Sequence, residues 1–258
     1  FKQKQEGFYT VTVPLPLGDN TPEGLRALAA IAETYAAEVR SAISQNLLLR
    51  FVPEEALGGL YEALLEAGLA LPEAHTLLDI TRCPGADTCN LAITRSRGLA
   101  QALEAHLSAL PLAQDPGAKA IGVKISGCPN SCGQHHIADI GFYGSSRKVG
   151  EREVPVYVLL LGGRTREGEA RFGQVVGRIP ARRVPEAVER ILKRYLEERQ
   201  NGESFQAYLD RVGAASFKPL LQDLQEVPPY EEAPEFYQDL GAEGEAFSVQ
   251  LGRGECAV

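Results

Sequence analysis

Four cysteines in two clusters are the residues of this 258-residue chain that are best suited to chemistry. Cys83 and Cys89 lie in the segment TRCPGADTCN with the spacing C-x5-C, and Cys128 and Cys132 lie in SGCPNSCGQHH with the spacing C-x3-C. Such cysteines can form disulfides, bind zinc or ligate an iron–sulfur cluster. Each use makes different demands on ligand spacing and on the redox environment.

An iron–sulfur cluster is the use that the sequence favours. The start FKQKQEGFYT is not a secretory signal, and a chain of this length needs no covalent cross-links, which argues against disulfides. A zinc-stabilised interaction domain stays an alternative, although C-x5-C is wide for one corner of a zinc tetrahedron. Four thiolates suit a [4Fe–4S] cluster. Pro84 and Pro129 each follow a cysteine and would stiffen its loop, and Cys89 directly precedes a helix predicted over 90–110, whose first amides favour an anionic group.

The first 70 or so residues predict a small β-α-β-α unit. Apolar residues alternate with Thr and Pro over 8–16, which is the period of a half-buried strand. Thr21-Pro22-Glu23 is typical of a helix start, because it combines a hydroxyl cap, an early proline and an acid. A second strand over 47–52 precedes another helix that begins with a proline.

The rest of the chain alternates strands and helices around the cysteines. A strand near 76–80 leads into the first pair, further strands are expected over 120–126, 137–143 and 155–161, and a helix begins near Val184, followed by two shorter helices before residue 222. Strands interspersed with helices indicate an α+β fold with mixed sheets and flanking helices. We expect three parts, at 1–72, 73–221 and 222–258.

The charge is distributed unevenly along the chain. The net charge of −8 resides in residues 222–258, which contain nine acids and one base and are expected to form an extended, solvated acidic tail. The remaining body is neutral, which argues against nucleic acid as a partner. The longest apolar run, 156–161, is too short for a membrane span, and we expect a cytoplasmic protein.

The cysteine segments resemble the C-terminal half of the sirohaem-containing nitrite and sulfite reductases. That family pairs C-x5-C with a distant G-C-P-N-x-C, which stands here as Cys83/Cys89 and Gly127–Cys132. A Q-N-L element precedes the first pair at Gln45-Asn46-Leu47, and Ile140-Gly141-Phe142 and Leu161-Gly162-Gly163 match downstream segments. The resemblance covers about 8–220. It implies a ferredoxin-like half-domain at 1–72 and a sirohaem/[4Fe–4S] domain at 73–221.

The resemblance also implies roles for individual residues. Cys83, Cys89, Cys128 and Cys132 would ligate one [4Fe–4S] cluster. The sulfur of Cys132 would in addition be the axial ligand of the sirohaem iron and thus a catalytic residue. Gln45 and Asn130 stand at positions that line the sirohaem in the family, where their amides would donate hydrogen bonds. A strand-end bond for Gln45 and a simple turn role for Asn130 remain open.

Members of the family reduce nitrite to ammonia, or sulfite to sulfide, with six electrons from ferredoxin or a similar one-electron donor. Ser131 and the segment Ala138–Phe142 resemble the nitrite-reducing branch more closely. Sulfite reduction and a haem-free [4Fe–4S] electron-transfer module are the alternatives. The chain lacks the basic substrate pocket that the family's first half supplies and begins at Phe1, so we expect it to require an N-terminal half.

Further residues stand out without a firm assignment. His135 and His136 follow the second pair and suggest either proton delivery or a packed pair of rings. The basic run Arg178–Arg194 suggests docking of an acidic ferredoxin, contact with haem carboxylates, or a solvated helix face paired with its own glutamates. His106 is expected to be structural, and Cys256 is either a reactive or a spectator thiol.

Overall fold

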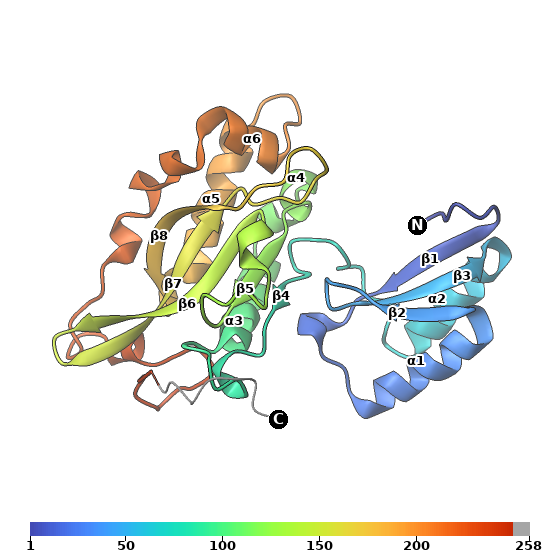
Figure 1. Cartoon of the computed structure of the whole chain (residues 1–258), viewed down its shortest axis with the longest axis horizontal. Coiled ribbons are helices and arrows are strands. Elements are labelled where there is room, and N and C mark those ends of the chain that lie inside the picture. Colours follow the sequence, from blue (N-terminus) through green and yellow to red (C-terminus); the bar gives the residue numbers. More distant parts are fainter. Residues whose placement is uncertain (250–258) are drawn as a thin grey trace. The chain divides into compact units, whose positions relative to one another are not determined.

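The computed structural model describes residues 1–249, and Cys256 lies outside the described residues. Two units divide the chain, the first covering Phe1–Asp79 and the second beginning at Ile80 (Figure 1). The first unit thus extends beyond Pro72, where the sequence suggests a boundary. All four cysteines of the two clusters belong to the second unit.

The first unit is a three-stranded antiparallel sheet with two helices. The strands are β1 (Phe8–Val13), β2 (Glu38–Ser41) and β3 (Leu47–Pro53), in the order β1-β3-β2, and the helices are α1 (Pro22–Tyr35) and α2 (Leu57–Glu66). The hydroxyl of Thr21 accepts the N–H of Gly24 at 3.0 Å, so the predicted cap of α1 is confirmed. Leu28 and Ala32 of α1 and Leu60 and Leu64 of α2 form the core with β1 and β3.

Strand β2 is the element of this unit that the sequence did not predict. It is an edge strand whose residues beyond Glu38 are exposed, so it has no apolar alternation to detect. Glu38 pairs with Arg50 of β3 at 2.6 Å, which ties this edge to the sheet through charges instead. The unit is therefore β-α-β-β-α rather than the predicted β-α-β-α.

The second unit is built on a five-stranded mixed sheet. Its strands are β4 (Thr81–Arg82), β5 (Val123–Ser126), β6 (Ile140–Val149), β7 (Arg152–Leu161) and β8 (Gln174–Pro180), and they follow one another in this order. The pairs β4–β5 and β5–β6 are parallel, whereas β6–β7 and β7–β8 are antiparallel. The helices are α3 (Ser96–Ser108), α4 (Pro116–Lys119), α5 (Val184–Glu198) and α6 (Phe205–Val212). The predicted α+β class with mixed sheets is confirmed.

Element boundaries near the cysteines differ from the prediction. Helix α3 begins at Ser96, so the expectation that Cys89 directly precedes a helix is wrong. Residues 85–95 instead form a loop that begins with a 3-10 turn (Gly85–Asp87) and is held by backbone bonds such as Ala86 N–H to Thr94 O at 3.0 Å. Strand β8 was not predicted, because its first two residues are exposed and Gly177 interrupts its apolar pattern.

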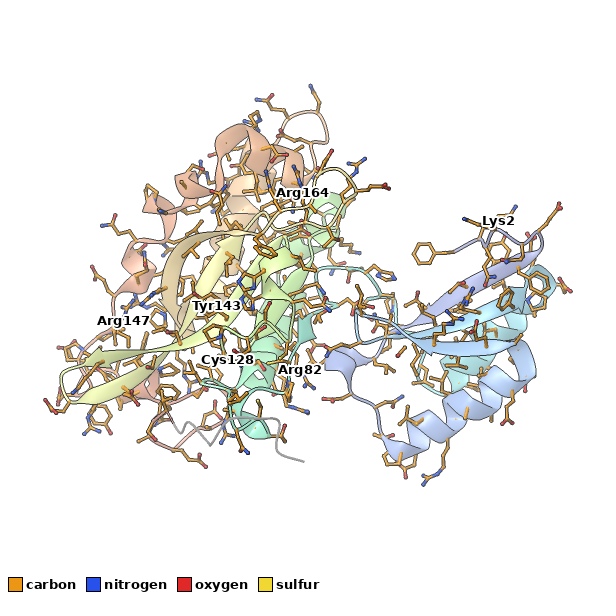
Figure 2. The ribbon with its side chains drawn as sticks, in the orientation of Figure 1. Lys2, Arg82, Cys128, Tyr143, Arg147 and Arg164 are labelled. Atoms are coloured by element: carbon orange, nitrogen blue, oxygen red, sulfur yellow. The ribbon has the colours of Figure 1, made fainter. Side chains whose placement is uncertain are left out.

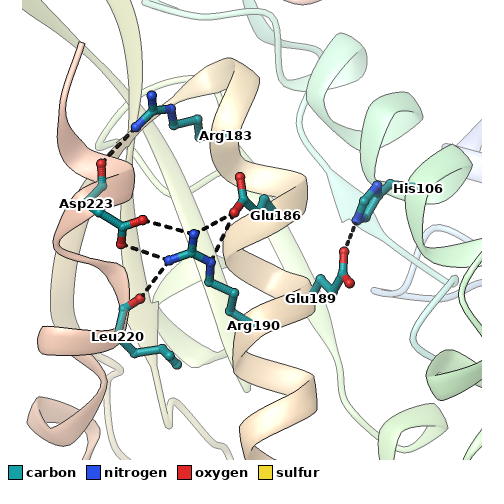
Figure 3. Close-up of polar contacts among 7 residues, drawn as sticks. All are labelled: His106, Arg183, Glu186, Glu189, Arg190, Leu220 and Asp223. Carbon is teal, nitrogen blue, oxygen red and sulfur yellow. Dashed lines mark hydrogen bonds and ion pairs between the residues drawn. The ribbon is translucent and has the colours of Figure 1, made fainter. Parts of the chain in front are cut away.

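Helices α3 and α5 meet through a polar contact, and α5 is tied to the segment that follows α6 (Figure 3). His106 of α3 and Glu189 of α5 are 2.8 Å apart, which supports the structural role expected for His106. Arg190 binds Glu186 at 2.6 Å and Asp223 at 2.8 Å. Arg194 contacts Glu198 at 3.1 Å. At Arg190 and Arg194, the basic run therefore pairs with glutamates of its own helix.

Residues 227–248, here called the strap, pack on the second unit rather than extending into solvent. Tyr237 is 3% exposed among Val154 and Val156 of β7, and its hydroxyl donates to the carbonyl of Pro228 at 2.9 Å. Asp239 is 4% exposed and accepts the backbone N–H of Arg95 at 2.6 Å. The expectation of an extended, solvated tail is therefore wrong for these residues, because scattered apolar side chains anchor an otherwise acidic segment.

The helices of residues 1–249 include none with the length and apolar character that a membrane crossing requires.

Candidate iron–sulfur site

The two cysteine loops leave neighbouring parallel strands at the same edge of the sheet. Cys83 follows the last residue of β4, and Cys128 follows β5 after Gly127. Arg82 lies opposite Ile125 in the parallel register, and Cys83 continues the ladder by donating its N–H to Ile125 O at 3.0 Å. Because the carboxyl ends of parallel strands meet at one edge, the fold brings the two sequence clusters together. Figure 2 shows Arg82 and Cys128 in this region of the second unit.

Direct hydrogen bonds join the loops to one another. The backbone N–H groups of Ile93 and Thr94 donate to Gly127 O at 2.8 and 3.0 Å, and Gly127 N–H donates to the sulfur of Cys83 at 3.0 Å. A Cβ on Gly127 would lie 2.6 Å from Thr94 O, so this approach requires glycine. The bonds fix the position of Cys83 relative to the loop that carries Cys128.

The four thiols differ in exposure. Cys83 and Cys128 are 7% and 8% exposed, Cys89 is half-buried, and Cys132 is exposed. No disulfide joins any of these four cysteines. The sulfur of Cys132 is thus the one most accessible to a second group.

Electrostatics couple the four thiols. Burial raises the pKa of Cys128, the backbone N–H of Asn130 lowers it, and the negative charges of Cys83, Cys132 and Cys89 each raise it. Neighbouring thiolates repel one another because each is negatively charged. A cationic iron group that binds to them neutralises this charge, so binding replaces their repulsion with attraction. No three His, Cys, Asp or Glu side chains of residues 1–249 are arranged around a single metal ion. Thiolates are the ligand type of iron–sulfur clusters, so the chemistry of these four side chains is compatible with such a cluster.

The loop that carries Cys128 and Cys132 is closed by the hydroxyl of Ser126. This oxygen accepts the N–H of Gly133 at 3.1 Å and lies 2.8 Å from His135 Nδ1. A Cβ on Gly133 would overlap the carbonyl of Ile125. Ser131 has a φ of 62°, and its hydroxyl lies 2.9 Å from His136 Nδ1. Cys132 is therefore held between two anchored neighbours.

The adjacent histidine rings pack against one another at a tilt of 32°. Their ring centroids are 4.1 Å apart, and the His135 ring also lies 4.8 Å from that of Tyr143. His135 is fully buried, and burial, followed by the charge of His136, lowers its pKa to about 4. His135 is consequently neutral near pH 7. Of the two roles considered for this pair, ring packing accounts for His135.

The other predicted site residues lie in different parts of the chain. Asn130 is exposed in the second cysteine loop, next to Cys128. Gln45 belongs to the first unit, in the turn between β2 and β3, with a φ of 69° and its side chain against Gly18. The roles of both residues toward a haem remain predictions.

Ser96 and Ser126 touch the cysteine loops but were not singled out from the sequence. Ser126 precedes Gly127-Cys128 directly, and that adjacency is the signal that could have identified it. Ser96 lies thirteen residues after Cys83 with its hydroxyl 3.4 Å from that sulfur. A lone serine at this spacing resembles any helix-start residue, so sequence alone offered no signal.

Comparison with known proteins gives a consistent result. Residues 73–227 match the nitrite and sulphite reductase 4Fe-4S domain, and residues 1–67 match the nitrite/sulfite reductase ferredoxin-like half domain. A ferredoxin–nitrite reductase of Synechococcus elongatus is 34% identical over 167 residues, which are 63% of this chain and 31% of that protein. A sulfite reductase [NADPH] hemoprotein beta-component of Methylobacterium nodulans is 28% identical over 218 residues, which are 81% of this chain and 34% of that protein.

A solved structure agrees with these sequence matches. The NirA protein of Mycobacterium tuberculosis superposes with a TM-score of 0.67 at 26% identity, covering 81% of this chain and 39% of that one. The chain thus spans about a third of the length of the curated relatives that it matches. Both domain matches and this likeness show that the chain belongs to the nitrite and sulfite reductase family of oxidoreductases, whose members carry a [4Fe–4S] cluster and sirohaem.

Proposed function

We propose that this chain is the [4Fe–4S]-binding part of a sirohaem-dependent nitrite reductase, with Cys83, Cys89, Cys128 and Cys132 as the cluster ligands. The observation that carries the proposal is the convergence of two loops from neighbouring parallel strands, which couples the charges of all four thiols. Family membership supports the same cofactor.

The proposed roles of the residues follow from their exposure. The buried sulfurs of Cys83 and Cys128 hold the cluster away from water, and the exposed sulfur of Cys132 presents a thiolate to the sirohaem iron. Ser126 and Ser131 fix the backbone on either side of that sulfur. The exposed amide of Asn130 and that of Gln45 would donate to the haem edge. When bound, the two cofactors supply the one-electron steps of a six-electron reduction of nitrite to ammonia.

Nitrite is the proposed substrate and ferredoxin the proposed donor. Several relatives are named ferredoxin–nitrite reductases, and two of them are each 34% identical to this chain over the matched residues. Sulfite is the second candidate, because relatives named as sulfite reductase components cover a larger share of the chain, 81%. We further propose that the reductase needs an N-terminal half, since the matches span only about a third of each relative.

The test is metal and sulfide analysis with a visible spectrum of the complete, anaerobically purified protein. The proposal predicts iron, labile sulfide and a Soret-type haem band. Iron and sulfide without that band would favour the haem-free electron-transfer module, and a colourless zinc protein would contradict the proposal. Turnover of nitrite and sulfite by the same preparation distinguishes the two substrates.

A further inference from the structure

The hydroxyl of Ser96 lies beside the sulfur of Cys83, inside the protein. Ser96 is fully buried at the start of α3, and its Oγ is 3.4 Å from Cys83 Sγ and 2.6 Å from the backbone carbonyl oxygen of Cys83. A hydroxyl has one proton, and here two acceptors of the same residue are within its reach. In the described structure that proton is donated to the carbonyl.

The balance between these two acceptors depends on the state of the sulfur. A protonated thiol can itself donate to Ser96, whereas a sulfur that ligates iron has no proton and only accepts. Additional negative charge on the cluster strengthens a hydrogen bond to that sulfur, because hydrogen bonds to a charged acceptor are stronger than those to a neutral one. Rotation about the Cβ–Oγ bond is sufficient to redirect the proton from the carbonyl to the sulfur.

We infer that Ser96 is a positioning residue that tunes the reduction potential of the cluster through Cys83. The inference rests on the function proposed above. Hydrogen bonds to ligand sulfurs stabilise the reduced, more negative form of an iron–sulfur cluster and so raise its potential. Gly127 N–H already donates to Cys83 Sγ at 3.0 Å. Ser96 adds a second donor, one that can shift between two acceptors where an amide cannot.

The chain offers a matched control for this hydroxyl. Thr94, in the loop that precedes α3, is also fully buried, and its hydroxyl donates to Gly127 O at 3.4 Å rather than to a sulfur. Thr94→Val removes a buried hydroxyl of the loop without removing a donor to sulfur. Ser96→Thr keeps the hydroxyl beside Cys83 and provides the conservative rescue.

The experiment is redox titration of the cluster in the complete protein, followed by electron paramagnetic resonance. Ser96→Ala is expected to lower the ratio of reduced to oxidised cluster about tenfold at a fixed potential, a shift of ~59 mV to more negative values for one electron. Ser96→Thr and Thr94→Val should titrate as the wild type does. In the wild type, electron–nuclear double resonance should show one more exchangeable proton coupled to the cluster than in Ser96→Ala.

Three results would overturn the inference while leaving the proposed function intact. An intact cluster with unchanged potential in Ser96→Ala would exclude tuning, and the same shift in Thr94→Val would assign it to general loop disturbance. Loss of the cluster in Ser96→Ala alone would make Ser96 a structural residue. A wild-type protein without any cluster would instead contradict the proposed function, and the inference with it.

Discussion

Glycine at position 133 is the residue on which the position of Cys132 depends most directly. Its N–H is bound by Ser126 at 3.1 Å, and the carbonyl of Ile125 occupies the space that a Cβ would need. Gly133→Ala must therefore displace the backbone next to Cys132, whereas the thiol itself stays in the sequence. We expect this variant to lose most of its bound iron and sulfide, as measured by chemical analysis of the purified protein.

The control is Gly58→Ala in helix α2, where a Cβ would meet nothing within 4 Å. Alanine is the better helix former by about 1 kcal/mol, so this variant should keep its iron and gain slightly in stability. Wild-type iron content in Gly133→Ala would show that the loop does not have to hold Cys132 in this conformation.

Asp239 is a buried carboxyl whose ionisation is unfavourable. Burial raises its pKa to about 6, although the N–H groups of Arg95 and Leu240, at 2.6 and 2.9 Å, favour the charged form. A carboxyl with a raised pKa stabilises the fold fully at low pH and loses that contribution as the pH rises to about 6. The free energy of unfolding of Asp239→Asn, relative to that of the wild type, should therefore rise by on the order of 3 kcal/mol between pH 4 and pH 7.

Denaturant unfolding of both proteins across this pH range measures the difference. Glu151→Gln serves as control, because the side chain of Glu151 is 98% exposed, and its difference from the wild type should not change with pH. If the difference in free energy of unfolding between Asp239→Asn and the wild type did not change with pH, the pKa of Asp239 would not be raised by burial.

At the scale of elements, the strap depends on a few apolar anchors. Tyr237 is 3% exposed against Val154 and Val156 and is the largest of these side chains. Tyr237→Ala should remove about 3–5 kcal/mol of packing and release the strap before the sheet unfolds. A protease specific for glutamate should then cleave at Glu231, Glu232 or Glu235 much faster than in the wild type.

Tyr61→Ala is the matched control, since Tyr61 is 59% exposed on α2. It should leave cleavage of the strap unchanged. Equal cleavage rates in Tyr237→Ala and the wild type would show that the strap is held by its polar contacts alone.

Elements with a regular apolar period could be predicted from the sequence, and others could not. Helices α1 and α5 and strand β7 have a capping residue or buried apolar positions that local physics recognises, and strands β1 and β3 have recognisable apolar sequences. Strand β2 is exposed and charged, and the first residues of β8 are exposed, so their pairing depends on partners distant in the sequence. The sequence predicts a solvated strap because its acidic residues outnumber the few apolar side chains that anchor it.

For the candidate site, too, the part that depends on a local sequence pattern could be predicted, and the part that depends on contacts between distant segments could not. The spacing of Cys83, Cys89, Cys128 and Cys132 is a local pattern that the sequence states directly. The contacts of Ser96 and Ser126 with the cysteine loops arise from strand pairing and helix placement, which no local pattern encodes. The roles of Gln45 and Asn130 depend on a haem and remain predictions.

At the scale of the whole molecule, we expect the division into two units to separate the stability of the first unit from cluster binding in the second. Leu49 is fully buried in the core of the first unit, whereas all four proposed ligands lie in the second. Leu49→Ala should destabilise the first unit by about 2–5 kcal/mol without reducing the amount of cluster iron. Hydrogen exchange of the first unit and iron analysis of the same sample measure both effects.

Leu103→Ala, at a fully buried position of α3 in the second unit, is the matched comparison. It should lower both stability and iron content, because α3 follows the Cys89 loop. If Leu49→Ala alone removed the cluster iron, the two units would not be separate in this respect.

Anomalous diffraction at the iron edge, from crystals of the complete protein grown without oxygen, would locate each iron relative to the four cysteine sulfurs. The proposed ligand set predicts one compact group of four irons within bonding distance of the sulfurs of Cys83, Cys89, Cys128 and Cys132, and a fifth iron that is bound by the sulfur of Cys132. Iron bound elsewhere, or the two cysteine loops ligating separate metals, would contradict it.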